Sequence, residues 1–281
     1  MSALLAASDL DQTLVFSARS AGTDVASLVC VETYEDRPIS YVTPAAARVL
    51  ERLAGTGRLV PVTTRTPAQY ARIRLPGPPP RYAVCANGGV LLVDGAPDAE
   101  WTERVRAELA GCAPVADVRA ALADLAAELH AAVPEPGPPG VHEVPGLFAY
   151  CVLRTGQRDA LGEGRLEELA ALAAGWGYGL SLQGRKLYAV PRGLTKSAAA
   201  VEVARRCGAD GFVAAGDSLL DTDLLLAAVE GVRPRHGELL AAGWDAPAVA
   251  LTGATGAAAG EEIARWLLER VGSAVPALTG G

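Results

Sequence analysis

The sequence predicts an α/β protein with a doubly wound parallel sheet that is interrupted by a separate α+β unit. Apolar strands alternate with amphipathic helices over residues 4–80, and the same alternation resumes after Gly193. Between these two parts the rhythm changes, because long helices are followed by paired strands. We therefore expect a Rossmann-like core of residues 1–80 and 190–281, and an inserted α+β domain of residues 81–189.

Several local signals mark element boundaries in the first part of the core. Thr43-Pro44 provides an N-cap and a first-turn proline, so we expect a helix to begin there and to end near Gly55. The β-branched run at 59–66 predicts a strand, and Pro67 is expected to open a further helix. Asn87-Gly88-Gly89 lies between two apolar runs and predicts a hairpin.

The polar segment 17–42 is irregular and predicts a flap or hairpin after the first strand. It carries scattered charges around one apolar patch at 28–31. We expect these charges to be solvated rather than to bind a ligand.

The inserted segment and the second part of the core contain the remaining elements. In the insertion we expect one or two helices over 101–133, a proline-rich loop, a strand at 147–155, a helix near 165–174 and a hairpin turning at Gly184-Arg185. In the second part we expect a helix from Thr195 to Gly208, a strand and helix over 212–229, a short apolar stretch at 229–232, a helix near 236–242, a strand at 247–253 and a final helix over 260–271.

Composition narrows the function classes. The formal net charge of −7 and the lack of a basic run argue against a nucleic-acid-binding surface. The five scattered cysteines have no CxxC spacing, which favours reduced thiols over disulfides or zinc. We find no signal peptide and no uninterrupted apolar stretch of membrane-spanning length. These features predict a soluble, cytoplasmic protein with no membrane or nucleic-acid partner. We expect a monomer or a homodimer, although composition does not decide between them.

Two carboxylates, Asp9 and Asp11, end the first apolar strand. In an extended chain, residues two apart point to the same face, so both would face one spot. Like charges that close need a proton or a cation between them, which suits a Mg²⁺ site with one carboxylate as nucleophile and the other as acid/base. An Asx-turn or a helix N-cap is the alternative interpretation of the same residues.

Three more polar groups follow other strands or open a helix, at the edge where open parallel sheets bind ligands. They are Thr63, Lys196 and the pair Asp217/Asp221 in GDSLLD. Each group alone is weak evidence for a functional site, because a lysine at the start of a helix is usually a surface residue and Asp217 could be an N-cap. Together with Asp9 and Asp11 they supply a nucleophile, an acid/base, phosphate donors and metal ligands for phosphoryl transfer.

This set of motifs resembles the haloacid dehalogenase superfamily of aspartate-nucleophile phosphatases. The similarity rests on DxDxT at 9–13, Thr-x-Arg at 63–65, a lysine that opens a helix, and GDSxxD at 216–221, in this order along nearly the whole chain. The insertion has the position of the family's second kind of α/β cap, as in sugar-phosphate phosphatases. Asn87-Gly88 resembles the turn found where cap meets core.

The resemblance implies a role for each matching residue. Asp9 would attack phosphorus, and Asp11 would protonate the leaving alcohol and later deprotonate water. The phosphoryl group would be held by Thr63 and Lys196, with Asn87 nearby. The Mg²⁺ ligands would be Asp9, the backbone carbonyl of Asp11, Asp217 and Asp221. The implied substrate is a small phosphate ester, with Mg²⁺ as cofactor.

The sequence departs from the family pattern at four positions. Gln12 stands where many members have glycine, and Thr64 replaces the glycine of Thr-Gly-Arg. Leu220 replaces the asparagine of GDxxND. Tyr188 lies where sucrose-phosphate phosphatases have aspartate, which weakens an assignment to sucrose phosphate. None of these changes removes a catalytic group.

Candidate substrate contacts in the cap are Arg154, Arg185, Lys186 and Tyr188, and solvated charges at a strand edge are the alternative for each cation.

A phosphomutase with the same aspartyl-phosphate chemistry is the closest alternative function. A catalytically idle binding module with this fold is another. The glycine-rich stretch LTGATGAAAG at 251–260 resembles a dinucleotide fingerprint, but its third glycine is out of place and no βαβ unit follows.

Overall fold

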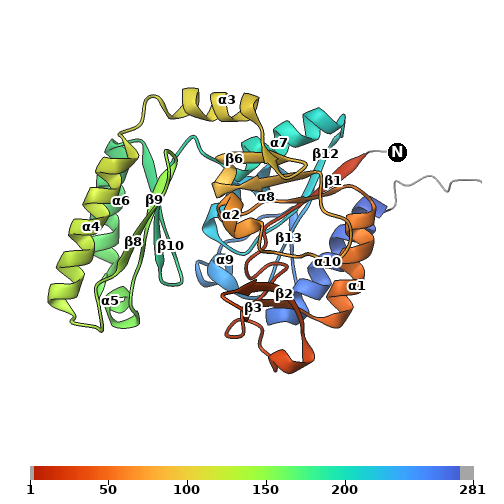
Figure 1. The fold of residues 1–281 in the computed structure, drawn as a ribbon, viewed down its shortest axis with the longest axis horizontal. Coiled ribbons are helices and arrows are strands. Elements are labelled where there is room, and N and C mark those ends of the chain that lie inside the picture. The colour runs from red at the N-terminus through yellow and green to blue at the C-terminus, as the bar shows by residue number, and fades with distance from the viewer. Residues whose placement is uncertain (1–2, 273–281) are drawn as a thin grey trace, which may run out of the picture. The chain divides into compact units, whose positions relative to one another are not determined.

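The computed structural model describes residues 3–272, and the chain divides into two units (Figure 1). Each unit has its own apolar core. One unit comprises Met1–Thr102 and Thr195–Gly281, and the other comprises Glu103–Leu194. The insertion thus begins later than the predicted residue 81. The reason is that the hairpin beginning at Tyr82 belongs to the first unit, where Val84 forms a parallel bridge with Val62.

The first unit contains the predicted parallel sheet, with strands in the order β14-β13-β12-β1-β4. Ala6 of β1 lies between Val213 of β12 and Leu59 of β4 in a parallel register. The strands are β1 (Leu4–Ser8), β4 (Leu59–Pro61), β12 (Gly211–Ala215), β13 (Gly231–Arg233) and β14 (Val249–Leu251). All are short, and all except the edge strand β14 are mostly buried, as expected for strands covered on both faces.

Helices cover both faces of this sheet. On one face α1 (Pro44–Gly55) and α10 (Gly256–Gly272) bury an apolar core that includes Leu50 and Leu267. Helices α7 (Lys196–Cys207) and α8 (Thr222–Ala227) pack against the strands from the other side. The predicted start of α1 is confirmed, because the Thr43 side chain accepts a hydrogen bond from the Ala46 N–H.

Smaller elements complete the first unit. The flap is a hairpin, as expected, and the strands β5 and β6 form the hairpin predicted around Asn87. These elements are η1 (Val25–Ser27), β2 (Val29–Tyr34), β3 (Arg37–Val42), α2 (Pro67–Tyr70), β5 (Tyr82–Cys85), η2 (Ala86–Gly88), β6 (Val90–Val93), β7 (Ala96–Pro97), η3 (Leu219–Asp221) and α9 (Gly237–Ala241).

The second unit is an antiparallel sheet, ordered β10-β11-β9-β8, with helices packed on one face. Helix α3 (Ala99–Leu109) leads into it from the first unit. Its elements are α4 (Val115–Ala132), β8 (Gly140–Val144), β9 (Phe148–Val152), α5 (Thr155–Ala160), α6 (Glu163–Gly175), β10 (Tyr178–Gln183) and β11 (Lys186–Pro191). The sequence did not predict β8, which directly follows the proline-rich loop, or the short helix α5.

No helix within residues 3–272 is both long and apolar enough to span a membrane.

Candidate active site

Three neighbouring strands of the parallel sheet end at the candidate site. Asp9, Thr63 and Asp217 follow β1, β4 and β12. Backbone hydrogen bonds hold the ends side by side: the Asp9 N–H donates to the Ala215 carbonyl at 2.9 Å, and the Val62 N–H donates to the Ser8 carbonyl at 2.7 Å. The site therefore lies at the carboxyl edge of the sheet, where such folds bind ligands.

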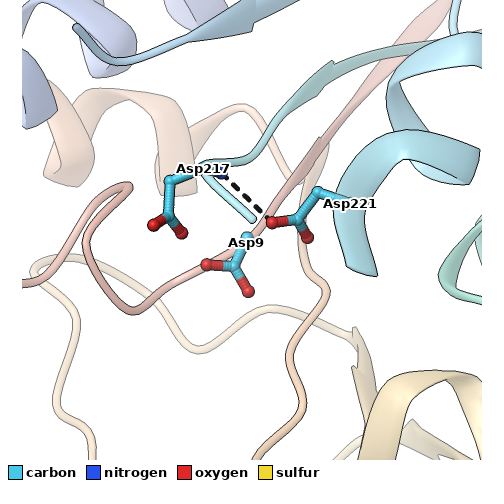
Figure 2. Close-up of side chains that lie close together, drawn as sticks. All are labelled: Asp9, Asp217 and Asp221. Carbon is cyan, nitrogen blue, oxygen red and sulfur yellow. Dashed lines mark hydrogen bonds between the residues drawn. The ribbon is translucent and has the colours of Figure 1, made fainter. Parts of the chain in front are cut away.

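Three buried carboxylates converge at this edge, as Figure 2 shows. One oxygen from each of Asp9, Asp217 and Asp221 lies within 4.8 Å of the others. The Lys196 ammonium is 1% exposed, and its Nζ lies 2.7 Å from Asp9 Oδ1 and 2.5 Å from Asp221 Oδ1. When ionised, three carboxylates against one ammonium leave an excess of buried negative charge. A divalent cation with oxygen ligands would compensate it.

The three carboxylates differ in their hydrogen bonds. Asp221 Oδ2 accepts from the Asp217 N–H at 3.1 Å, the Ser218 N–H at 2.9 Å and the Ser218 hydroxyl at 2.8 Å. Its Oδ1 is bonded to Lys196. Among residues 3–272, Asp217 instead receives two long contacts of 3.5 Å, from Gln12 and Thr13. The Asp221 oxygens thus already accept hydrogen bonds from groups of the protein, whereas the Asp217 oxygens have lone pairs that could bind an added ligand.

The electrostatics of the site follow from this burial. Burial raises the pKa of Asp9 to about 7 although the Lys196 ammonium opposes the shift, and Asp221 and Asp11 raise it further. Burial and then the charge of Asp9 raise the pKa of Asp217 well above its ordinary range. Burial alone would lower the pKa of Lys196, but Asp221 and Asp9 outweigh it, so that pKa is raised. The cluster favours either bound protons or a cation.

Asp11 pairs with Arg65, whereas Asp9 pairs with Lys196, which differs from the expectation that both carboxylates face one spot. The strand ends at Ser8, and the chain then turns, with Gln12 at a φ of 60°. The half-exposed Asp11 carboxylate accepts from Nε and Nη2 of Arg65, each at 2.7 Å. The left-handed φ of Gln12 also explains why a glycine suits this position.

Thr63 and Asn87 are brought together at the end of β4. Both are buried, and the Thr63 carbonyl accepts the Asn87 N–H at 3.0 Å. Thr63 Oγ1 accepts the Arg65 N–H at 3.2 Å. Thr64 is only partly buried. The two predicted phosphate-binding residues therefore form one local structure in the first unit.

The turn at Asn87-Gly88 packs directly against the start of α7. Gly88 has a φ of +96°, and a Cβ at this position would lie 2.2 Å from the Thr195 carbonyl oxygen. The Gly88 carbonyl accepts the indole N–H of Trp101 at 2.8 Å, which fixes the turn. Thr195 caps α7 by accepting the Ala198 N–H. Glycine at 88 thus permits the close approach that positions Lys196, the next residue.

The candidate substrate contacts lie in the second unit. Arg185 and Lys186 are exposed at the turn between β10 and β11, and Arg154 is exposed at the start of α5. Tyr188 differs, because it is 5% exposed and its ring centroid lies 5.3 Å from that of Tyr150. It packs with other aromatic rings of the sheet.

The glycine-rich stretch at 251–260 uses its backbone donors internally. Glu262 accepts the N–H groups of Gly253 and Ala254 at 2.8 and 3.0 Å. The Gly256 N–H donates to Nδ1 of His236 at 3.2 Å. An intrachain carboxylate thus occupies donors that a nucleotide phosphate would need, which argues against the dinucleotide interpretation.

Three residues that contact the candidate site or support it were not predicted from the sequence. Glu32 of the flap is 1% exposed, so the expectation of solvated charges is wrong at this residue, although Glu35 and Asp36 are exposed. Arg65 was visible in Thr-x-Arg, but no spacing rule links it to Asp11. Ser218 could be recognised only as a possible N-cap, and its hydroxyl instead supports Asp221.

Comparison with solved structures shows the same fold in other proteins. A sucrose-phosphatase from Synechocystis sp. PCC6803, in complex with sucrose and phosphate, has a TM-score of 0.63 and 17% identity, covering 95% of this chain and 98% of that chain. The C-terminal domain of C. albicans trehalose-6-phosphate phosphatase has a TM-score of 0.57 and 12% identity, with 95% and 93% coverage. A phosphatase of the haloalkanoate (HAD) superfamily from Bacteroides thetaiotaomicron has a TM-score of 0.56 and 13% identity, with 96% and 95% coverage.

The predicted architecture is therefore confirmed: the chain has the fold of haloacid dehalogenase superfamily phosphatases, with a parallel α/β core and an inserted α+β unit. No protein-family model matches the chain, and no curated protein matches it. At these identities the comparison establishes the fold, and the chemistry has to be argued from the site itself.

Proposed function

We propose that this protein is a Mg²⁺-dependent phosphomonoesterase that hydrolyses a small organic phosphate through an aspartyl-phosphate. The observation that carries this proposal is the environment of Asp9. It is a buried carboxylate, bonded to Lys196, adjacent to Asp217, a buried carboxylate with spare acceptor capacity, and two residues from the half-exposed Asp11. A nucleophile, a fixed cation, a metal ligand and an acid/base are the parts that phosphoryl transfer requires.

The reaction has two steps. In the first, an Asp9 oxygen attacks phosphorus, the ester P–O bond breaks, and Asp11 gives its proton to the departing alkoxide. In the second, Asp11 takes a proton from water as the water oxygen attacks phosphorus. The P–O bond to Asp9 then breaks, which releases phosphate and restores the Asp9 carboxylate.

Thr63, Lys196 and Asn87 are the proposed phosphate-binding residues. A hydroxyl, an ammonium and an amide can each donate to phosphoryl oxygens, and all three residues are buried at the carboxyl edge of the sheet. Donors held in place before the substrate arrives stabilise developing charge without reorganisation.

The residues present fit a Mg²⁺ ion. We assign Asp9, Asp217 and the backbone carbonyl of Asp11 as its ligands, and we assign Asp221 to the support of Lys196 and Ser218, because its oxygens already accept four hydrogen bonds. This revises the expected role of Asp221. When bound, the ion would neutralise charge on the phosphoryl oxygens and on the carboxylates.

A sugar phosphate is the substrate class to test first. Similar structures include phosphatases described as acting on sucrose phosphate and trehalose 6-phosphate. We propose that the inserted unit selects the leaving group, with Arg154, Arg185, Lys186 and Tyr188 as candidate contacts. A phosphomutase would use the same core groups but would return the phosphoryl group to the substrate.

The test is phosphate release from a panel of sugar phosphates, nucleotides and phospho-acids, with Mg²⁺ and with EDTA. We expect turnover of one or a few esters that needs Mg²⁺ and falls by at least about 10³-fold in Asp9→Asn. Asp94→Asn is the matched control, because Asp94 is an exposed carboxylate on the turn after β6. Release that persists in Asp9→Asn, or no release from any ester, would contradict the proposal.

A further inference from the structure

A chain of charged side chains joins the flap to Asp11. Arg65 Nη1 lies 2.8 Å from Glu32 Oε2, while Nε and Nη2 of the same guanidinium bind the two oxygens of Asp11. Glu32 in turn accepts the Ser40 hydroxyl at 2.6 Å and Arg72 Nε at 3.0 Å. The guanidinium is thus held between a buried carboxylate from β2 and the half-exposed Asp11.

The three side chains in this series of ion pairs differ in burial, and the difference indicates that Glu32 orders Arg65 and that Arg65 orders Asp11. The Glu32 side chain is 0% exposed, that of Arg65 is 13% exposed and that of Asp11 is 51% exposed. Exposed ion pairs are usually weak because both side chains must be ordered. Here Arg65 is already ordered by Glu32, so its planar fork can bind both Asp11 oxygens at little further entropic cost.

We infer that Arg65 is a positioning residue for the acid/base Asp11, and that Glu32 of the flap holds Arg65 in place. The inference rests on the proposed function for the role of Asp11, and it adds a connection between the β2–β3 hairpin and the proton-transfer step. Arg65 acts through Asp11, so its loss should mimic loss of Asp11 rather than loss of phosphate binding.

The dependence of the rate on the leaving group distinguishes a loss of Asp11 function from a loss of phosphate binding. Alkyl phosphates such as glycerol phosphate need a proton on the departing oxygen, whereas p-nitrophenyl phosphate has a leaving group stable as an anion. We expect Arg65→Lys, which keeps the charge but loses the fork, to lower kcat for glycerol phosphate at least about 10-fold. The first turnover of p-nitrophenyl phosphate should change less than about threefold.

A double-mutant cycle gives the sharper test. If Arg65 acts only through Asp11, Arg65→Lys in an Asp11→Asn background should change kcat less than about twofold. Arg81→Lys is the matched control, since Arg81 forms an exposed pair with Asp94 in the same unit, and its kcat should equal that of the parent. A further loss of about 10-fold or more in the double variant would assign Arg65 to the substrate and overturn the inference.

Crystal structures of Arg65→Lys and Glu32→Gln test the inference without turnover. The Asp11 side chain should leave its present orientation in Arg65→Lys, and the Arg65 guanidinium should shift in Glu32→Gln. An unmoved Asp11 in Arg65→Lys would overturn the inference. If the parent hydrolyses no ester, the proposed function fails, and the Asp11 orientation in these crystals still decides whether Arg65 positions it.

Discussion

The ammonium of Lys196 and the carboxylate of Asp221 form an ion pair from which water is excluded. Nζ lies 2.5 Å from Oδ1, and the two side chains are 1% and 0% exposed. Because Asp221 is also bonded to the backbone and hydroxyl of Ser218, it fixes Lys196 beside Asp9. In the proposed function the pair supports the site, although its carboxylate lies within the acidic cluster.

We predict that Asp221→Asn and Asp217→Asn have opposite effects on stability without metal. Asp221→Asn breaks a buried ion pair, which should lower the free energy of unfolding by about 3 kcal/mol. Asp217→Asn removes a carboxylate whose donors in the described part of the chain, Gln12 and Thr13, lie 3.5 Å away, so its free energy of unfolding should equal or exceed that of the parent. Urea unfolding in EDTA measures both. Equal losses would show that the two carboxylates have equivalent roles.

The same two variants should differ in their response to Mg²⁺. Asp217→Asn should raise the Mg²⁺ concentration for half-maximal activity at least about 10-fold, because a proposed ligand is weakened. Asp221→Asn should lower kcat with a smaller change in that concentration, because Lys196 loses its support. Titration of phosphate release with Mg²⁺ measures both quantities. An unchanged titration for Asp217→Asn would remove Asp217 from the metal site.

The pH dependence of stability should reverse when Mg²⁺ is added. Asp9 and Asp217 have raised pKa values, so the metal-free folded protein binds more protons than the unfolded chain, and its stability should fall as pH rises from 3.8 to about 7. The lowered pKa of Glu32 has the opposite sign, and its contribution is lost only as pH falls below 4.5. Bound Mg²⁺ needs ionised carboxylates, so it should stabilise more at higher pH.

Urea midpoints between about pH 5 and about pH 8, in EDTA and in Mg²⁺, test this reversal. Asp217→Asn should show a shallower decline in EDTA and a smaller gain from Mg²⁺. Stability in EDTA that increases over this range would contradict the assigned direction of the carboxyl pKa shifts.

Gly88→Ala should disturb the site through the start of α7. The new Cβ would lie 2.2 Å from the Thr195 carbonyl, so we expect a loss of at least about 2 kcal/mol in the free energy of unfolding, together with reduced kcat. Gly95→Ala is the matched control, since Gly95 has a φ of +82° but no atom within 4 Å of a new Cβ. Gly95→Ala should lower the free energy of unfolding by about 1 kcal/mol and leave kcat unchanged. Similar effects from both would exclude packing against Thr195 as the cause.

Much of the core could be predicted because its signals are local. The Thr43 N-cap, the αL residue Gly208 that ends α7 and the short apolar strands each depend on a few adjacent residues. The convergence of Asp9, Thr63 and Asp217 followed from one rule, that parallel strands meet at their carboxyl ends. These expectations needed no knowledge of side-chain packing.

The remaining features depend on contacts between distant segments. Arg65 meets Glu32 and Asp11 only after the flap folds back, and no periodicity encodes that meeting. The alternation rule failed at Asp11 because the strand ends at Ser8, before that residue. The end of the core was misplaced because the hairpin after Tyr82 has the same pattern in either unit, and only the Val62–Val84 bridge assigns it.

If Asp9 carries the phosphoryl group, a phosphorylated enzyme should accumulate when its hydrolysis is blocked. In Asp11→Asn, p-nitrophenyl phosphate with Mg²⁺ should release a rapid burst of about one equivalent of p-nitrophenol per site, because the first step needs no acid while hydrolysis lacks its base. Acid quenching and peptide mass spectrometry should then find phosphate on Asp9, and EDTA or the Asp9→Asn change should abolish both. Mg²⁺-dependent turnover by the parent with no burst in Asp11→Asn and no phosphate on Asp9 would show that Asp9 does not carry the phosphoryl group.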